Sequence, residues 1–338
     1  MKRIIRAIRT PLLCVLCVAV AIFAILYPMR DAVCEEGEAW RGVLRLWQID
    51  SFEGGRGSRA SFLNSVARRY ETAGGMLVLV TQHTAESAEN ALRDGQVPDL
   101  ISYGPGVGFV ADLARPLPGF SFAAGALGGQ TYAVPWCRGG YFLLTGEGDF
   151  SDISAENTVI GKGRGASVRA AAALEGLVGT FAVQDSLQAY LSLIGGKYRY
   201  MVGTQRDVWR LRTRQFSFAA KPLAAYNDLL QYISVCAEDA HRYAASLAFL
   251  EVLLSQEVQQ TLTTIGMMSI QYSIYADDAV LSAAEGEGAR STVPAFISEE
   301  ARAELDACAQ SVLNGDKSGA KKLENFLAEY CKKSSFAV

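Results

Sequence analysis

The chain has 338 residues, 50% of them hydrophobic and 20% charged, and it is longer than the roughly 250–300 residues that one hydrophobic core normally supports. Its formal net charge is −3. Five of the six charged residues before Cys34 are basic, so the remaining chain carries about −7 and shows no basic stripe. The composition therefore argues against nucleic acid as a partner and favours a globular protein of two lobes.

An apolar run of membrane-spanning length lies near the N-terminus. Pro11–Pro28 reads PLLCVLCVAVAIFAILYP and follows a short basic stub, which should stay in the cytosol. We expect residues 1–33 to form this stub and one uncleaved transmembrane helix, with the globular part outside the cytoplasm. A signal peptide cut after Ala19-Val20-Ala21 is the competing interpretation. Asp31–Val33 lacks the small residues expected before a lipid-modified cysteine at Cys34.

Cysteine spacing indicates neither a zinc site nor a dense disulfide framework. Two of the seven cysteines lie in the apolar run, and the other five are widely spaced without a CxxC pair. We expect at most one disulfide, with Cys308 and Cys331 as the favoured pair, and free buried thiols elsewhere.

Strand and helix patterns alternate after the N-terminal segment. We predict strands at Val43–Ile49, Met76–Thr81 and Asp99–Tyr103, and helices at Arg59–Thr72 and Thr84–Asp94. This alternation predicts a parallel sheet with right-handed crossovers, whose ligands sit beyond the carboxyl ends of the strands. Three loops then share one rim: Asp50–Glu53, Gln82-His83 and Tyr103–Gly106.

Gly128–Tyr141, reading GGQTYAVPWCRGGY, is predicted to be the strand that leaves the first lobe. Its glycine pairs flank an alternating segment that can enter a second compact unit without a long linker. We expect the chain to cross back near Pro222–Ser234. Trp136 and Arg138 are then the leading candidates for the floor of an interlobe cleft.

The second part of the chain shows weaker patterns. Gly146–Ser167 ends in GKGRGAS, which lacks the GK[ST] ending of a phosphate loop and is interpreted as a solvated loop. Gly203–Trp209 is interpreted as a loop rich in hydrogen-bonding groups, of the kind that gathers ligand contacts. The other expected elements are helices at Ala170–Val178, Val183–Ile194, Asp239–Gly266, Ser298–Asn314 and Ser318–Cys331, and a strand at Tyr198–Val202.

From Val43 to Tyr330 the chain resembles the extracytoplasmic solute-binding proteins of ABC importers, in particular the group that includes sugar-binding receptors. The resemblance lies in LRLWQIDSFEGGRGSRASFLNSVARRYE, VPDLISYG, GGQTYAVPWCRGGY and AASLAFLEVLLSQEVQQTLTTIG. It implies an α/β, two-lobed, periplasmic-binding-protein-like (type II) fold with a hinge, after the N-terminal transmembrane helix. Its first lobe would comprise residues 43–137 plus about 226–280, and its second residues 138–225 plus about 281–338.

The resemblance also implies a function. A monomeric, membrane-tethered receptor on a bacterium, Gram-positive by type, would deliver a small polar solute, with carbohydrate the favoured class, to an ABC importer permease. No cofactor, metal or catalytic activity is expected. The chain lacks the usual lipid-attachment motif and is shorter than most sugar receptors, so a tethered sensor or accessory protein, whose cleft its own side chains would fill, is the alternative. A hydrolase is a distant third, because no nucleophile elbow is present.

The ligand-binding candidates are the residues whose positions correspond to the cleft-lining loops of the solute-binding proteins that this chain resembles. Aromatic rings cover the apolar faces of sugars, while amide, carboxylate and guanidinium groups pair with hydroxyls; Arg138 would suit an anionic solute equally well. Core packing is the alternative for the aromatic residues, most of all for Trp47 inside a strand, and a salt bridge is the alternative for the Arg-Asp pair. A metal site at His83 is not favoured. The candidates are Asp50, Ser51, Glu53, Tyr103, Trp136, Arg138, Tyr141, Gln205, Arg206, Asp207 and Trp209.

Overall fold

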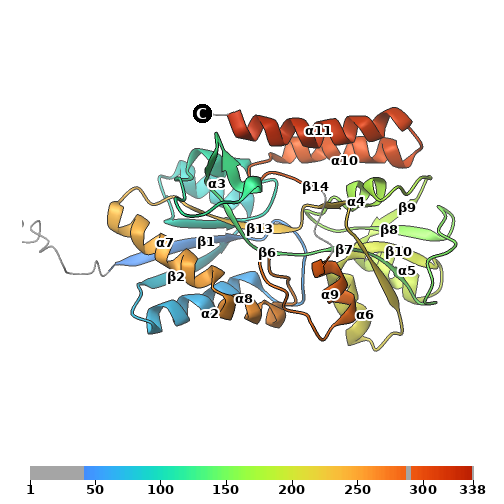
Figure 1. The fold of residues 1–338 in the computed structure, drawn as a ribbon, viewed down its shortest axis with the longest axis horizontal. Helices are drawn as coiled ribbons and strands as arrows, with labels where there is room; N and C mark the ends of the chain where they lie inside the picture. The colour runs from blue at the N-terminus through green and yellow to red at the C-terminus, as the bar shows by residue number, and fades with distance from the viewer. Residues whose placement is uncertain (1–41, 287–290, 337–338) are drawn as a thin grey trace, which may run out of the picture. The chain divides into compact units, whose positions relative to one another are not determined.

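The computed structural model describes residues 42–286 and 291–336, which belong to one compact unit of the chain (Figure 1). The apolar run Pro11–Pro28 and Cys34 lie outside the described residues. Within the described part, no helix combines the length and the apolar character needed to cross a membrane.

The first lobe is built on a five-stranded sheet in the order β2-β1-β3-β13-β6. β1 pairs in parallel with β2 and β3, as the alternating pattern predicts, and β13 runs antiparallel to β3 and β6. Helix α2 begins after Ser58, whose hydroxyl accepts from the Ser61 amide at 3.2 Å, and it buries a stripe against the sheet. The elements are β1 (Val43–Ile49), α2 (Arg59–Thr72), β2 (Leu77–His83), α3 (Ala85–Arg93), β3 (Leu100–Tyr103), β6 (Val134–Arg138) and β13 (Leu230–Val235).

The second lobe carries another five-stranded sheet, in the order β11-β7-β10-β8-β9. β8, β9 and β10 are parallel, and β7 runs antiparallel to β10 and β11. Its elements are β7 (Tyr141–Thr145), β8 (Thr158–Lys162), α4 (Val168–Leu174), β9 (Ala182–Asp185), α5 (Ser186–Ile194), β10 (Tyr200–Thr204), α6 (Gln205–Thr213) and β11 (Ala219–Leu223).

The chain crosses between the sheets at the predicted places. β6 leads through Gly139-Gly140 into β7, so Gly128–Tyr141 holds the first crossing. The return runs from β11 through β12 (Tyr226–Asn227) into β13, inside the predicted range. A further crossing comes earlier than the expected boundary near residue 280, because Met268 already packs in the core of the second lobe with Phe142 and Met201.

The helical segment predicted from Asp239 to Gly266 is divided into α7 (Ala240–Leu254), α8 (Gln256–Gln260) and the 3₁₀ turn η3 (Thr261–Ile265). Ser255 is the reason: its backbone is extended, with ψ of 146°, and its hydroxyl caps α8 by accepting from the Val258 amide. The apolar spacing continues across this break, so periodicity alone does not reveal it.

A C-terminal hairpin of α10 (Glu299–Leu313) and α11 (Lys317–Phe336) contacts both lobes (Figure 1). α10 packs on α4, where Arg169 pairs with Asp306 at 2.5 Å, and Arg302 donates to the Pro105 carbonyl of the first lobe. The assignment of residues 281–338 to the second lobe alone therefore does not describe this hairpin. The remaining elements are η1 (Gly108–Asp112), η2 (Ala123–Gly125), β4 (Ala126–Leu127), β5 (Gln130–Thr131), α9 (Ala279–Gly286) and β14 (Ser291–Thr292).

Three predicted segments of the second lobe are corrected. Gly146–Ser167, interpreted as a solvated loop, contains the buried strand β8 of the second sheet. Val183–Ile194 is a strand followed by a helix, because the Asp185 carboxylate accepts from the Leu187 and Gln188 amides and starts α5 there. Gly203–Trp209 is the end of β10 and the start of α6, where Thr204 and Asp207 form a capping box. Both helix starts are set by capping side chains rather than by apolar spacing.

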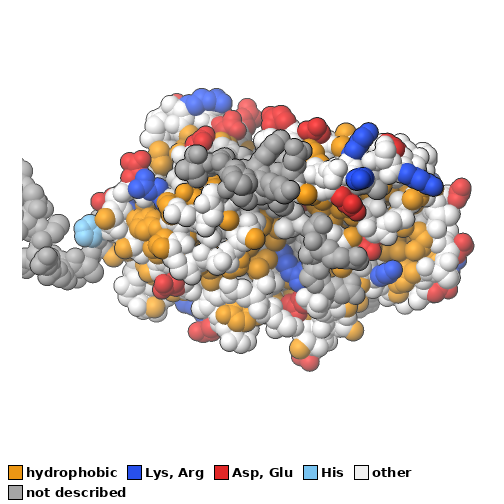
Figure 2. All heavy atoms as spheres, turned by 45° about the horizontal axis from the view of Figure 1, so that its top comes forward, with side chains coloured by type: hydrophobic (Ala, Val, Ile, Leu, Met, Phe, Trp, Pro, Cys, Tyr) orange, Lys and Arg blue, Asp and Glu red, His pale blue; other side chains and the backbone are white. Residues whose placement is uncertain are grey.

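Basic and acidic side chains are interspersed over the face seen in Figure 2. This distribution agrees with the absence of a basic stripe in the sequence after Cys34.

Candidate functional site

The carboxyl ends of the parallel strands in the two sheets meet in the middle of the molecule. The segment after β1 touches the loop after β8, and the Glu53 amide donates to the Arg164 carbonyl at 3.1 Å. Gly165 has a φ of +65°, and a Cβ there would collide with the Ser51 carbonyl. We call this backbone contact the central contact; GKGRGAS, interpreted as a solvated loop, supplies one side of it.

A cavity of about 770 Å³ lies on one side of the central contact and is called the mixed-charge cavity. Asp50 organises its floor, because its carboxylate accepts from Arg59 Nε at 3.0 Å, Gln82 Nε2 at 2.7 Å and Gln48 Nε2 at 3.0 Å. Its lining carries both signs of charge, with Asp50, Glu86 and Glu299 against Arg164 and Arg302. Both lobes and the C-terminal hairpin contribute to it.

His83 is on the wall of the mixed-charge cavity. Its ring lies 4.6 Å from the Trp47 ring, and burial lowers the pKa of the imidazole. Nε2 is 3.1 Å from the Thr81 hydroxyl. The described residues include no group of three or more His, Cys, Asp and Glu side chains placed to hold a metal ion.

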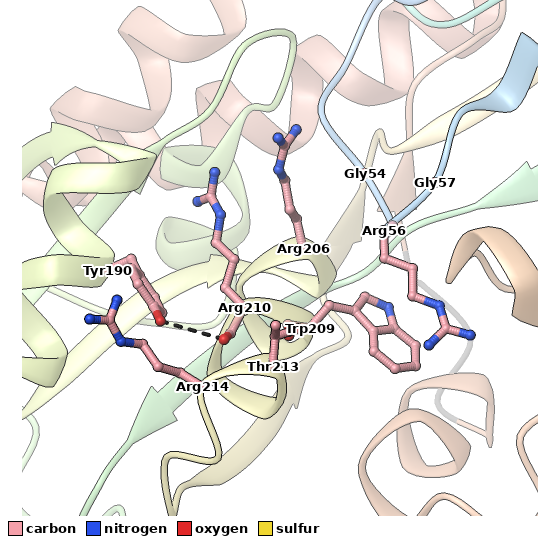
Figure 3. A pocket seen from close by; sticks show the side chains of 10 residues that line it. Gly54, Arg56, Gly57, Tyr190, Arg206, Trp209, Arg210, Thr213 and Arg214 are labelled. Atoms are coloured by element: carbon pink, nitrogen blue, oxygen red, sulfur yellow. Dashed lines mark hydrogen bonds between the residues drawn. The ribbon is translucent and has the colours of Figure 1, made fainter.

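A second cavity, of about 650 Å³, lies between the glycine-rich loop after β1 and helix α6, and it is called the arginine pocket (Figure 3). Four arginines and no carboxylate are among its lining residues. The lining is Gly54, Gly55, Arg56, Gly57, Tyr190, Arg206, Trp209, Arg210, Thr213 and Arg214.

Two carboxylates stand at the border of the arginine pocket. Glu53 pairs with Arg206 at 3.4 Å, which joins the lobes beside the central contact. Asp207 pairs with Arg210 at 2.9 Å, and burial raises the pKa of this carboxyl although the Thr204 amide and Arg210 oppose the shift. Arg210 also donates to the Ser186 hydroxyl at 2.6 Å.

Trp209 is held on several sides. Arg56 and Arg212 lie over its ring, 4.6 Å and 5.0 Å from the centroid, and its indole N–H donates to the Gly266 carbonyl at 3.2 Å. Gln205 donates to the same carbonyl, so it links the lobes instead of facing a cavity.

Trp136, expected at the cleft floor, belongs to the core of the first lobe. It is 0% exposed, stacks on Phe62 at 5.5 Å and donates to the Ser102 hydroxyl at 3.0 Å. The alternation in Gly128–Tyr141 correctly predicts the strand β6, but the face of β6 that carries Trp136 packs against α2. A solute cannot reach the indole in this arrangement, so core packing, the alternative interpretation, describes it.

Tyr103 and Tyr141 are also buried. The Tyr103 hydroxyl lies 3.1 Å from that of Ser234, and Tyr141 donates to Asp228; burial is the main cause that raises both phenol pKa values. Arg138 is mostly buried at the hinge, where it donates to the carbonyls of Ser269, Ala284 and Glu285. Tyr103 packs inside the first lobe, whereas Tyr141 and Arg138 make their contacts at the hinge. None of the three side chains lines either large cavity.

The structure therefore divides the eleven candidates. Five are partly exposed where they line or border the two cavities, namely Asp50, Ser51, Glu53, Arg206 and Trp209, and ligand contact by them stays a prediction. Asp207 is buried beneath Arg210, and the other five make the internal contacts described above.

Sequence reasoning missed Arg56, Arg210, Arg214 and Arg164. A signal existed on α6, because residues 206, 210 and 213–214 recur at helical spacing and share one face. That signal could be used only with the segment recognised as a helix.

The described cysteines are free thiols. Cys137 and Cys236 are buried, which raises the pKa of each to about 12, and Cys308 is partly buried. The side chain of Cys331 lies outside the described residues, and the predicted pairing with Cys308 stays a prediction.

No protein-family model matches this chain, and no curated protein matches its sequence. Solved structures match its fold. The sugar-binding protein MalE from Xanthomonas citri has a TM-score of 0.59 and 15% identity, over 87% of this chain and 98% of that one. The maltose-maltodextrin binding protein of Alicyclobacillus acidocaldarius has a TM-score of 0.56 and 15% identity, over 86% of this chain and 100% of that one.

Iron-bound HitA from Pseudomonas aeruginosa has a TM-score of 0.55 and 14% identity, over 83% of this chain and 99% of that one. At such identities the similarity establishes the fold. The chain has the two-lobed α/β fold of these binding proteins, which confirms the predicted fold class from Val43 onward. Sugar and iron both appear among the ligands of these proteins, so the ligand has to be argued from the site.

Proposed function

We propose that this protein is an extracytoplasmic solute-binding receptor that delivers a small polar solute to an ABC importer. The observation that carries the proposal is the pair of cavities at the carboxyl ends of both sheets, each lined by residues from both lobes. Several solved proteins with this fold bind saccharides, among them maltotriose and maltotetraose. The role is binding and not catalysis.

Closure about the hinge is the proposed mechanism. The chain crosses between the sheets through short segments around Gly139-Gly140 and Tyr226–Asn227, which can absorb a rotation of one lobe against the other. Opening breaks the central contact and the Glu53–Arg206 pair, while Arg138 and Gln205 stay near the axis about which the lobes rotate. Solute that contacts both lobes then favours the closed state by its difference in affinity for the two states.

The membrane anchor is part of the proposal. The apolar run Pro11–Pro28 behind a basic stub would tether the receptor beside its permease, with the globular part outside the cytoplasm. Protease treatment of intact cells tests this arrangement: the globular part should be degraded while the N-terminal stub is protected.

Solute binding by the full-length protein in detergent is the decisive test. We expect at least one saccharide, polyol, amino acid or anion to raise the melting temperature and to reduce the radius of gyration in small-angle X-ray scattering. A protein that binds none of these solutes, and whose radius of gyration never changes, would instead be a tethered sensor or accessory protein. The central contact between the lobes is the feature that such a protein would retain.

A further inference from the structure

The arginine pocket has an excess of positive charge. Four arginines line it, and the two carboxylates at its border pair with only two of them, Arg206 and Arg210. Among the described residues no carboxylate lies within ion-pair distance of Arg56 or Arg214; Arg56 donates instead to the Thr263 carbonyl at 3.1 Å. The chain beyond Cys34 is acidic overall, so this local excess is opposite in sign to the net charge of that part of the chain.

Arg206 and Arg210 are placed to act together. They are one turn apart on α6, and Figure 3 shows both side chains extending the same way from the helix. Asp207 is 1% exposed and holds Arg210 from the protein interior, so its carboxylate does not occupy the cavity. Glu53 is partly exposed and occupies one side of Arg206 at the cavity border.

The wall opposite α6 consists of three glycines and Arg56, so Arg56 supplies its only side chain longer than a hydrogen among the described lining residues. A Cβ at Gly54 would lie 2.8 Å from the Phe52 ring, and one at Gly57 would lie 2.9 Å from Ile265, so these positions exclude side chains. The cavity has a volume of about 650 Å³, enough for a monosaccharide-sized solute.

We propose that the arginine pocket binds the oxyanion group, a carboxylate or a phosphate, of a small solute, with Arg206 and Arg210 as its donors. Planar guanidinium groups pair with two oxygens of such a group at once, which a neutral hydroxyl cannot match. The oxyanion replaces Glu53 at Arg206. The inference rests on the proposed receptor function and names the ligand class of its site.

Calorimetric titration of the full-length protein in detergent at low ionic strength tests the proposal. The probes are glucose, glucuronate, glucose 6-phosphate and inorganic phosphate, which separate the sugar ring from the charged group. We expect at least one of the three anions to bind on the order of ten- to a hundredfold more tightly than glucose, since hydrogen bonds to charged groups are the stronger ones. Added sodium chloride should weaken that binding.

Variants locate the site. R206Q should weaken binding of the anion about tenfold or more, and R210Q should do the same. The matched control is R68Q, which removes the same charge from an exposed position on α2 and should leave the affinity unchanged. The melting temperature of each variant without solute checks its folding, and the salt dependence of the unmodified protein reports on the charge without any substitution.

The outcomes separate the two proposals. Tight binding of inorganic phosphate alone would support the pocket and identify a free oxyanion as its ligand. Glucose that binds as well as the anions, or an affinity that R206Q leaves intact, would overturn the oxyanion inference while the receptor function stands. If none of the four probes binds, the oxyanion inference is overturned. The proposed receptor function is overturned as well only if no solute of the wider panel binds.

Discussion

The two cavities beside the central contact differ in how their charged groups are engaged. In the mixed-charge cavity, Asp50 accepts three hydrogen bonds and fixes the buried Arg59, so its charge serves the first lobe itself. In the arginine pocket, Arg206 is about two-fifths exposed, and its one carboxylate partner comes from the opposite lobe. Charged side chains at the carboxyl ends of the two sheets are thus fixed within one lobe in the first cavity, but are more exposed and paired across the lobes in the second.

The largest effect is expected at Asp50. In D50N, Arg59, whose side chain is 5% exposed, loses its carboxylate partner, and we expect the free energy of unfolding to fall by about 3 kcal/mol. Urea unfolding measures it. The matched control is E89Q, which breaks the exposed Glu89–Arg93 pair and should cost less than about 1 kcal/mol. If D50N lowers the free energy of unfolding no more than E89Q does, the Asp50–Arg59 pair does not stabilise the first lobe. The two cavities then do not differ in how their charged groups are engaged.

Substitution of Gly165 tests whether the central contact between the two cavities keeps the lobes together. G165A introduces both backbone strain and a collision with the Ser51 carbonyl, and we expect it to cost about 2 kcal/mol and to increase the radius of gyration. G176A shares the positive φ, at +86°, but its Cβ meets nothing within 4 Å, so it should cost about 1 kcal/mol and leave the radius unchanged. An unchanged radius in G165A would show that the lobes do not depend on this contact.

Substitution of Glu53 tests whether the partner of Arg206 in the arginine pocket can be exchanged for an anion. E53Q keeps the shape of the side chain and removes the charge that competes for Arg206, so anion affinity should rise about two- to fivefold. Calorimetric titration with glucuronate and glucose 6-phosphate measures the change. A fall in affinity would mean that Glu53 supports the binding geometry instead of competing with the ligand.

The smallest effect is expected from His83. Burial lowers its pKa in the folded state below the value near 6.5 of the unfolded chain, so the unfolded chain takes up a proton first as the pH falls. This contribution to stability is fully present above about pH 6.5 and is lost progressively below it. Urea unfolding of the unmodified protein and of H83Q between pH 7.5 and 5.5 should show a shallower decline in the variant. Parallel declines would exclude His83 as the cause.

The first lobe could be predicted from the sequence because each of its strands and helices carries its own local signal. β1, α2, β2, α3 and β3 lie within a few residues of the predicted ranges, since strand alternation and capping residues mark their ends. In the second lobe, β8 lies inside a segment rich in turn residues and α6 begins directly at the end of β10. Local pattern therefore failed where turn residues surround a short strand and where one element follows another without a loop.

The candidate site could be predicted only in part. Polar residues after β1 were found because position at the end of a parallel strand is enough to place them. Three of the four aromatic candidates, all but Trp209, were misplaced because large rings pack in a buried sheet as well as against a sugar. Trp136 and Tyr103, for example, lie within strands that are covered on both faces. The arginine pocket joins residues near position 56 with residues near position 210, and no local pattern connects those segments.

The position of β6 has a consequence for the order in which the protein is made. In the first sheet this edge strand pairs with β13, and every strand of the second sheet lies between them in the chain. A nascent chain that has not yet reached Val235 holds β6 without its partner strand, so the first lobe cannot be completed before the second has been synthesised. The second lobe is in this sense an insertion, and we expect the two to fold as one interdependent unit rather than as successive domains.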